Sequence, residues 1–497
     1  MIAIKSHSCD MLSSQFLRRL APRVRNVSLS RALATNGFSV DRSGLIGVKS
    51  GGGAPEVSED ERDAINLEHK EPMSELAKDL ASIIGVKGPI SLHEYLGQCS
   101  NHVLYGYYQT EKEKIGSRGD FTTAPEVSQL FGEALGMWAL SHWMALGEPE
   151  KINIVELGPG KGTLMKDVLA VAARFPKFEK AIAVSLVELS ESMRDIQRAA
   201  LKCPVADIPL PEQSKSKVFD AQEVLAKDKE AMDLAMKERR TAVTMSGVPI
   251  NWYYTLNQVS DTQMQEGEKA APMLVLAQEF LDVFPVHQFV YKNGKWLEKL
   301  VDVDTSSDSP YHFRVVLSQS PTPAAMSLLG RATGGAFKDG DGIEVSPVAL
   351  ATCEEIAGMV CRSGGAALLI DYGANATSSD SLRGFQEHKT TSVLSMPGLV
   401  DTTVDVDFDA IGRVAARRGA KVVGAITQAE FLIKMGIVDR AEQLVSLEST
   451  SDEQQYELMS SLRFLVDEQA MGERFKVMTI LDPKLQHATS HIGFPTK

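Results

Sequence analysis

The sequence predicts an α/β protein with a mainly parallel sheet and helices on both of its faces. Short apolar runs typical of buried strands occur at 152–157, 183–188, 273–277 and 366–371, and segments with helical spacing separate them. Such an alternation builds a parallel sheet, because each crossover helix returns the chain to the same edge. At 497 residues, the chain exceeds the usual size of one hydrophobic core. We therefore expect one elaborated domain or two domains.

The first fifty residues differ in composition from the rest of the chain. They contain six arginines, many serines and only two acidic residues. This composition is typical of a mitochondrial transit peptide. We expect residues 1–50 to be such a peptide and residues 51–72 to be a flexible linker. The alternative for the first segment is a disordered basic tail.

The overall composition excludes several classes of protein. A net charge of −13 argues against non-specific binding to nucleic acid, which needs an excess of Lys and Arg. No apolar run approaches the roughly 18 to 20 residues that span a bilayer, so we expect no transmembrane segment. The five cysteines are scattered without CxxC spacing, which favours reduced thiols over a metal site. The sequence leaves the oligomeric state open, a homo-oligomer included.

The patterned part of the chain begins with a helical region over 73–150. Within it, Thr123 and Glu126 have the spacing of a capping box, and Pro125 lies in the first turn. A strong helix is predicted to follow Thr123. Two later segments interrupt the strand–helix alternation and are interpreted as insertions: the charged 212–240 and the Asp-, Ser-, Thr- and Gly-rich 302–345.

Three glycines follow the first predicted strand, which ends in Glu156 and Leu157. Gly158, Gly160 and Gly162 precede a predicted helix whose N-terminus offers free N–H groups. Dinucleotide enzymes use the spacing G-x-G-x-x-G, whereas this spacing is G-x-G-x-G. The pattern resembles the loop that binds S-adenosylmethionine, with Glu156 near the cationic end of the ligand. The alternative is a structural turn between strand and helix.

The second predicted strand also ends in an acid, Glu188. In nucleoside-binding α/β folds an acid at this point accepts hydrogen bonds from the ribose hydroxyls. We expect that role for Glu188. The alternative is an exposed carboxylate that caps the next helix.

Two further acids, Glu279 and Asp282, follow the strand at 273–277 and therefore lie at a carboxyl end of the sheet. Paired carboxylates match the donor fork of a guanidinium, so both are candidate catalytic residues that hold a substrate arginine. Methyl transfer to a guanidine nitrogen needs alignment and charge stabilisation, with no metal or covalent nucleophile. The alternatives are a helix-capping role for Glu279 and a structural role for Asp282. His287 is interpreted as a packing or hydrogen-bonding residue rather than a base.

The segment Gly119–Gln129, GDFTTAPEVSQ, resembles a signature of the MidA-like methyltransferases, the mitochondrial complex I assembly-factor arginine methyltransferases. Resemblance to this family continues in order over roughly 73–480. It covers the glycine loop and LVE at 186–188, EFLD at 279–282 and PVH at 285–287, LIDYG at 369–373, RGF at 383–385, DVDF at 405–408 and MGERF at 471–475.

The resemblance implies a seven-stranded class I (Rossmann-like) methyltransferase domain over 151–480, followed by a tail at 481–497. It implies S-adenosyl-L-methionine as cofactor and a location in the mitochondrial matrix. It also implies symmetric dimethylation of an arginine in a complex I core subunit, which supports assembly of the complex.

Residue by residue, the resemblance implies that the helical region closes the cofactor site. The residues implicated are Asp120, Thr122, Pro125 and Glu126. Glu279 and Asp282 fall where arginine methyltransferases hold the substrate guanidinium. Ala124 departs from the family pattern, which has Ser at this position.

Two other functions are compatible with parts of this pattern. An NAD-linked oxidoreductase would use the same glycine loop, although the spacing disfavours it. A non-catalytic complex I assembly chaperone would keep the methyltransferase fold as a binding scaffold, because fold alone does not fix function.

Overall fold

The computed structural model describes residues 70–109, 120, 122–204, 240–265, 271–306, 308–329, 337–485, 489 and 491–495. All of these lie in one structural unit, residues 44–497. The transit peptide expected at 1–50 lies outside the described residues, as do most of the linker at 51–72 and residues 212–239 of the first insertion. None of the helices in the described part of the chain has the length and apolar character that crossing a membrane requires.

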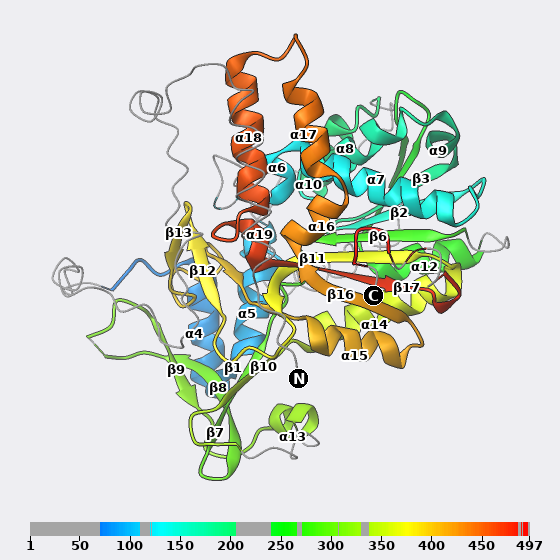
Figure 1. Ribbon diagram of the computed structural model, residues 1–497. Helices are drawn as coiled ribbons and strands as arrows, with labels where there is room; N and C mark the ends of the chain where they lie inside the picture. Colours follow the sequence, from blue (N-terminus) through cyan, green and yellow to red (C-terminus); the bar gives the residue numbers. More distant parts are fainter. Residues whose placement is uncertain are drawn as a thin grey trace, which may run out of the picture. The chain divides into compact units, whose positions relative to one another are not determined.

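A large mixed sheet dominates the structure (Figure 1). In the described residues it has nine strands in the order β16-β17-β11-β6-β2-β3-β5-β4, with β15 paired to β11. The strands are β2 (Ile152–Leu157), β3 (Ile182–Val187), β4 (Arg240–Val243), β5 (Pro249–Tyr253), β6 (Met273–Gln278), β11 (Ala366–Ala374), β15 (Val406–Asp407), β16 (Lys421–Thr427) and β17 (Phe475–Leu481).

The predicted parallel arrangement is found in the five central strands, β11, β6, β2, β3 and β5. Both edges are antiparallel, since β4 pairs in that sense with β5, and β17 with both β11 and β16. At the first edge the reason is local. Residues 244–248 make a tight turn between β4 and β5, and a short turn reverses the chain instead of crossing over the sheet.

Helices cover both faces of this sheet, which explains why every residue of β2 is buried (Figure 1). On one face, α14 and α15 share a hydrophobic core with β6 and β11, formed by side chains such as Ile356, Phe408, Val275 and Leu369. On the other face, α7 packs against α8. The bounds are α7 (Gln129–Ala145), α8 (Thr163–Ala172), α12 (Leu256–Gln265), α14 (Pro347–Ser363) and α15 (Phe408–Arg417).

Two smaller antiparallel sheets are formed mainly by the chain that follows the carboxyl ends of β6 and β11, and the first also includes β1 from the start of the described chain. The first contains β1 (Ile90–Ser91), β7 (His287–Lys292), β8 (Lys295–Val303), β9 (Phe313–Leu317) and β10 (Gly342–Val345). The second contains β12 (Arg383–Gln386), β13 (Lys389–Thr391) and β14 (Asp401–Thr403). The segment interpreted as an insertion at 302–345 thus contains β9, α13 (Pro323–Leu329) and β10.

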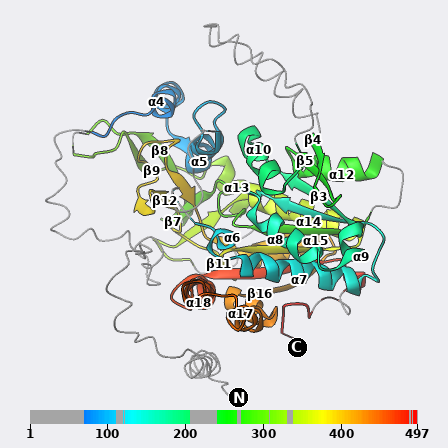
Figure 2. The ribbon, with the colours of Figure 1, turned by 90° about the horizontal axis from the view of Figure 1, so that it is seen from above.

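The helices at the start of the described chain pack on the first small sheet (Figure 2). These are α4 (Glu75–Lys87) and α5 (Leu92–Asn101). They form a second hydrophobic core, in which Leu80 and Tyr95 lie against Val301 and Phe313. The segment 73–150 is therefore divided, with α4 and α5 on the small sheet and α7 on the large one.

The remaining helices connect or flank these layers. Four of them, α16 to α19, fill the connection between β16 and β17, and α17 packs against α7 (Figure 1). The bounds are η2 (Tyr107–Gln109), α6 (Ala124–Val127), α9 (Pro176–Ala181), α10 (Glu191–Ala200), α16 (Gln428–Lys434), α17 (Ile437–Val445), α18 (Asp452–Val466), α19 (Met471–Arg474) and η3 (Pro483–Leu485).

The predicted helix after Thr123 is interrupted, and its capping box is wrong. Ser128 has extended backbone angles, φ −161° and ψ 137°, so the short α6 ends there and α7 begins. Thr123 is the N-cap of α6 but makes no capping bond with its side chain. The Glu126 carboxylate instead accepts a hydrogen bond from the Thr163 hydroxyl, which draws it away from its own helix and onto α8.

Candidate functional site

The carboxyl ends of the central strands bring most of the predicted site residues to one edge of the large sheet. Glu156 lies near the end of β2, Glu188 directly follows β3, and Glu279 directly follows β6. Because β2, β3 and β6 are parallel neighbours, these three acids share the same edge. Open α/β sheets bind their ligands at such edges.

The glycine loop has the conformation that its sequence predicts. Gly158, Gly160 and Gly162 all have positive φ, at +64°, +50° and +81°. A Cβ added at Gly158 would lie 2.9 Å from Cδ2 of Phe280, which belongs to the loop after β6. The loop backbone therefore lies against the ring of Phe280, and Gly162 is the N-cap of α8.

Glu156 has a buried carboxylate with an unused acceptor. Its side chain is 4% exposed, and Oε2 has no hydrogen-bond partner. Burial, and then the nearby charge of Glu188, raise the pKa of Glu156 to about 8. Buried polar atoms are normally paired, so an orphaned carboxylate oxygen beside a glycine loop is suited to a ligand that brings a positive charge or a donor.

Glu188 is connected to the glycine loop through Gln197 of α10. Nε2 of Gln197 donates to Oε2 of Glu188 at 3.0 Å and to the Gly160 carbonyl at 2.8 Å. The other oxygen of Glu188 accepts the N–H of Ser190 at 2.8 Å. The N-cap of α10 is Ser190 itself, so Glu188 does not have the simple helix-capping role. Burial raises the pKa of Glu188 above its ordinary value.

Glu279 links the loop after β6 to α6. Its Oε1 accepts the N–H of Ala124, the first residue of α6, at 3.1 Å, and also a hydrogen bond from Gln278. The predicted alternative, a cap on the next helix, is wrong, because the helix that Glu279 contacts precedes it by 155 residues. Burial is the main cause that raises the pKa of Glu279 to about 8. Its backbone has φ +48°, an unusual value for a residue with a side chain.

Asp282 lies in the same loop and is 5% exposed. Its Oδ2 accepts the Thr403 hydroxyl at 2.7 Å, whereas Oδ1 has no partner. The loop itself is held by Asp371 of β11, whose Oδ2 accepts the N–H groups of Phe280, Leu281 and Asp282 at 3.1, 2.9 and 3.3 Å. Burial raises the pKa values of both aspartates.

The four residues implicated by the Gly119–Gln129 segment lie in different surroundings. Asp120 is buried and accepts the Tyr107 hydroxyl at 2.9 Å and the N–H of Glu387, in the β12–β13 turn, at 2.8 Å. Glu126 contacts the first residue of α8, directly after the glycine loop. Pro125 is buried in α6, and Thr122 is exposed. Glu126 and Pro125 therefore lie beside the loop, whereas Asp120 fixes the hairpin of the second small sheet.

Sequence reasoning did not assign a role to three residues of this edge: Gln197, Asp371 and Asp401. The sequence could have indicated a role for Asp371, because it is an acid near the end of a predicted buried strand. Nothing in the sequence indicated a role for Gln197, since a polar residue inside an amphipathic helix is ordinarily on the solvent face. Asp401, on β14, lies about 120 residues from Glu279 in the sequence and could not be connected to it without the fold.

His287 has the packing and hydrogen-bonding role that its sequence context indicates. Its Nδ1 lies 2.6 Å from Oε1 of Glu298, and its ring stacks on His93 with centroids 4.5 Å apart. Within the described ranges, no group of three or more His, Cys, Asp or Glu side chains is arranged to hold a metal ion.

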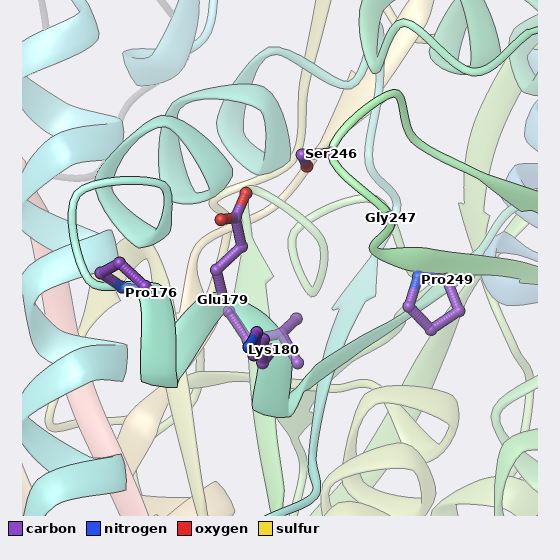
Figure 3. A pocket seen from close by; sticks show the side chains of 7 residues that line it. Pro176, Glu179, Lys180, Ser246, Gly247 and Pro249 are labelled. Carbon is purple, nitrogen blue, oxygen red and sulfur yellow. The ribbon is translucent and has the colours of Figure 1, made fainter.

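A hollow of about 250 Å³ lies elsewhere on the large sheet (Figure 3). It is lined by Pro176, Glu179, Lys180, Ile182, Ser246, Gly247 and Pro249. Ile182 and Pro249 are the first residues of β3 and β5, so this hollow lies at the amino ends of the strands. It is therefore at the opposite edge from the acids and the glycine loop.

Comparison with known proteins agrees with this arrangement. The family model of a putative S-adenosyl-L-methionine-dependent methyltransferase matches residues 134–426, more than half of the chain. The chain belongs to this methyltransferase family. The expected family is confirmed, and S-adenosyl-L-methionine is its cofactor.

Relatives of the family extend the match over most of the chain. The mitochondrial protein arginine methyltransferase NDUFAF7 of Homo sapiens is 36% identical over 412 residues, covering 82% of this chain and 84% of its own. That of Danio rerio is 34% identical, covering 82% and 87%. The Drosophila melanogaster homologue is 35% identical, covering 82% and 84%.

A solved methyltransferase-like protein from Burkholderia thailandensis has the same fold. Its crystal structure, bound to S-adenosyl-homocysteine, superposes with a TM-score of 0.61 at 23% identity, covering 82% of this chain and 91% of that chain. At this identity the likeness supports the methyltransferase fold alone.

The residues present suit the cofactor of the family. The orphaned Oε2 of Glu156 offers an acceptor to a cationic group, and the glycine loop exposes its backbone without side chains. Glu188 is held in place by Gln197 at the adjacent strand end. These three features suit S-adenosyl-L-methionine, which is a nucleoside linked to an amino acid.

Proposed function

We propose that this protein is an arginine methyltransferase of the mitochondrial matrix that symmetrically dimethylates an arginine in a complex I core subunit and so supports assembly of the complex. Several relatives are named as mitochondrial protein arginine methyltransferases, and the leader composition agrees with import. The acidic loop after β6 is chemically suited to a guanidinium. The catalytic domain of this proposal is a seven-stranded class I core. Its strands are β2, β3, β5, β6, β11, β16 and β17, to which β4 and β15 are additions.

Three groups of residues would hold the cofactor. Glu156 would receive its cationic end, because Oε2 is buried and lacks a partner. The backbone of Gly158, Gly160 and Gly162 would border it. Glu188 would accept hydrogen bonds from the ribose hydroxyls. Glu126 and Pro125 would close the site from α6, together with Asp120 and Thr122 of the same segment.

When bound, the cofactor supplies an electrophilic methyl group on a positively charged sulfur. Glu279 and Asp282 would orient the substrate guanidinium through its N–H donors. A guanidinium nitrogen that gains a methyl group must lose a proton. Glu279 is suited to accept it, because binding of the guanidinium favours the ionised form of this buried carboxyl, which can then take up a proton. Its Oε1 remains held by the N–H of Ala124.

The main support for the proposal is that two acidic groups lie at the same edge of the large sheet. Glu156, whose Oε2 has no partner, lies beside the glycine loop, and the acidic loop after β6 contacts Gly158 through Phe280. The deciding experiment measures transfer of a labelled methyl group from S-adenosylmethionine to complex I subunits by the full-length protein. Mass spectrometry then maps the product and distinguishes symmetric from asymmetric dimethylarginine.

The control is Gly160→Val, which places a β-branched residue at φ +50° in the loop. Loss of both cofactor binding and methyl transfer in a variant that still folds would support the enzyme. Normal complex I assembly with the same variant in cells would instead favour the non-catalytic assembly chaperone. Cofactor binding without any methylated arginine in the wild type would contradict the proposal.

A further inference from the structure

The loop after β6 contains carboxylates that have no cationic partner. Glu279 and Asp282 form no salt bridge with any part of the chain that the structure describes, and neither does Asp401 of β14. The charge of Arg383 partly offsets the burial that raises the pKa of Asp282, but its guanidinium forms its ion pair with Asp405 at 2.6 Å, and Arg474 lies 3.7 Å from the same carboxylate. Buried carboxylates are normally paired with a cation, and these three have no ion-pair partner among the described residues.

The pleat of β14 places Asp401 beside Asp282. Residues i and i+2 of a strand point to the same face, so the side chains of Asp401 and Thr403 share one face of β14. Thr403 donates to Oδ2 of Asp282 at 2.7 Å, and the N–H of Val404 donates to the Asp282 carbonyl at 3.0 Å. Asp401 therefore belongs to the same carboxylate group, and its exposed fraction is only 6%.

An unsatisfied atom indicates that this group binds a ligand. Oδ1 of Asp282 is buried and has no hydrogen-bond partner. Asp401, by contrast, has a fixed neighbour, since the Tyr108 hydroxyl donates to its Oδ1 at 3.0 Å. Among the described side chains, no metal-binding arrangement includes these acids. A planar organic cation with several N–H donors is the ligand that matches several separate carboxylates.

We propose that Asp401 is a third carboxylate of the guanidinium-binding site, beside Asp282 and Glu279, and that Tyr108 orients it. The inference rests on the proposed arginine methyltransferase activity and assigns a substrate-binding residue to the second small sheet. A guanidinium has five N–H donors, more than two carboxylates can accept in a bidentate manner. The third carboxylate therefore favours arginine over any neutral side chain of the same shape.

The electrostatics of the group agree with this assignment. Burial, and then the negative charge of Asp282, raise the pKa of Asp401 to about 8. Burial also raises that of Glu279 to about 8, and the charges of Asp282 and Asp401 contribute. These acids are thus largely protonated at pH 7 in the absence of a cation. Binding of a guanidinium favours their ionised forms, so it releases protons.

The test compares two peptides of nearly the same shape, of which only one has the positive charge and the five N–H donors of a guanidinium. Acetyl-Gly-Arg-Gly-amide and its citrulline counterpart are titrated calorimetrically into the full-length protein saturated with S-adenosyl-homocysteine. Titrations at pH 7 in two buffers of different ionisation enthalpy give the number of protons released. The wild-type protein is expected to prefer the arginine peptide and to release protons. Asp401→Asn is expected to reduce the preference about 10- to 100-fold and to release fewer protons.

Three further variants separate binding from folding. Asp401→Glu keeps the charge and is expected to recover most of the arginine preference. Tyr108→Phe removes the hydroxyl without changing the charge and is expected to have a smaller effect. Asp409→Asn is the matched control, because it removes a carboxylate that is half exposed on α15 and should change neither quantity. Retained affinity for S-adenosyl-homocysteine shows that each variant is folded.

The outcomes distinguish this inference from the function on which it rests. Unchanged arginine preference and proton release in a folded Asp401→Asn variant would overturn the role of Asp401 while arginine methylation by the wild type stands. A wild-type protein that binds the cofactor but methylates no arginine would remove the proposed function, and this inference with it. Loss of arginine preference in Asp401→Asn with recovery in Asp401→Glu supports it.

Discussion

Gln197 donates to Glu188 and to the carbonyl of Gly160 from the same nitrogen, at 3.0 and 2.8 Å. Its orientation is fixed, because the indole of Trp252 can only donate and lies 2.9 Å from the Gln197 oxygen. Gln197 is completely buried. One amide therefore sets the relative position of Glu188 and the glycine loop, the two elements that we propose to bind the cofactor, at the ends of the neighbouring strands β3 and β2.

We expect Gln197→Glu to weaken binding of S-adenosyl-homocysteine about 10- to 100-fold. The new carboxylate would face Glu188 and the Gly160 carbonyl, so three acceptors would meet without a donor. Calorimetric titration measures the change in affinity. Ile196→Ser, an exposed substitution on the same helix, is the control and should bind normally. Equal affinities for Gln197→Glu and the wild type would show that the amide does not position the site.

Cofactor affinity should depend on pH through Glu156. The pKa of this carboxyl is about 8 in the unliganded protein, so it is mostly protonated at pH 6 and must ionise to receive a cation. Affinity for S-adenosylmethionine is therefore expected to rise up to about tenfold per pH unit between pH 6 and 7.5. Above that range an α-amino group itself begins to titrate, near 7.7–8.0.

Glu156→Gln removes the titrating group and should give weak affinity that changes little over the same range. Affinity is measured by calorimetry at four pH values on both proteins. A wild-type affinity that is constant from pH 6 to 7.5 would contradict the role of Glu156 in binding the cationic end.

Gly158→Ala should lower the affinity for the cofactor as well as the stability of the protein, because the new Cβ adds a steric contact to the strain of the positive φ. The new Cβ would lie 2.9 Å from the Phe280 ring, in a loop where both elements border the site. Gly147→Ala is a matched control, because Gly147 has φ +85° with nothing within 4 Å of the added Cβ. Each should lose about 1–3 kcal/mol of unfolding free energy from strain.

Only Gly158→Ala should also lose affinity for S-adenosyl-homocysteine. Adding Phe280→Leu to it should recover part of that affinity, because a smaller side chain relieves the contact. Chemical denaturation and calorimetry provide the two measurements. If both glycine variants bind the cofactor equally, the packing of Phe280 against the loop has no part in binding.

The sequence was sufficient for the elements that depend on local patterns. The strands that became β2, β3, β6 and β11 were predicted within a few residues, because continuous apolar runs indicate buried strands. The acids at their ends could be placed on one edge for the same reason. The glycine loop was recognisable since its conformation requires residues without side chains.

What the sequence could not provide were contacts over long separations. Thr123 and Glu126 satisfied the pattern of a capping box, yet Glu126 contacts Thr163, and that competing partner is 37 residues away. The same holds for Asp401, which only the pleat of β14 brings to Asp282. The antiparallel edges of the large sheet also depend on turns and insertions that carry no strong periodic signal.

Asp167 of α8 should make the stability of the protein depend on pH. It is 6% exposed, its Oδ2 has no partner, and burial raises its pKa to about 6. The folded state therefore favours the protonated form. Stability from this group is fully present below the unfolded pKa near 3.8 and is lost as the pH rises through about 6.

Asp167→Asn should therefore raise the free energy of unfolding by about 1–3 kcal/mol at pH 7.5, and by less at pH 4.5. Urea denaturation at both pH values measures the difference. Asp195→Asn on the exposed surface of α10 serves as control. A stabilisation that is equal at the two pH values would show that titration of Asp167 is not its cause.

The carboxylate of Asp371 receives three backbone N–H groups from a loop that lies 89 to 91 residues earlier in the chain. The intervening chain leaves the large sheet after β6, builds most of the first small sheet, and returns through α14 to β11, directly beside its point of departure. Insertions and deletions in the part of that excursion beyond the loop at 279–282 would therefore leave the proposed substrate-binding loop in place beside Asp371. The first small sheet can therefore change in sequence and length to bind new protein partners without moving the loop that Asp371 holds. It is the part of the molecule that we expect to differ most between relatives.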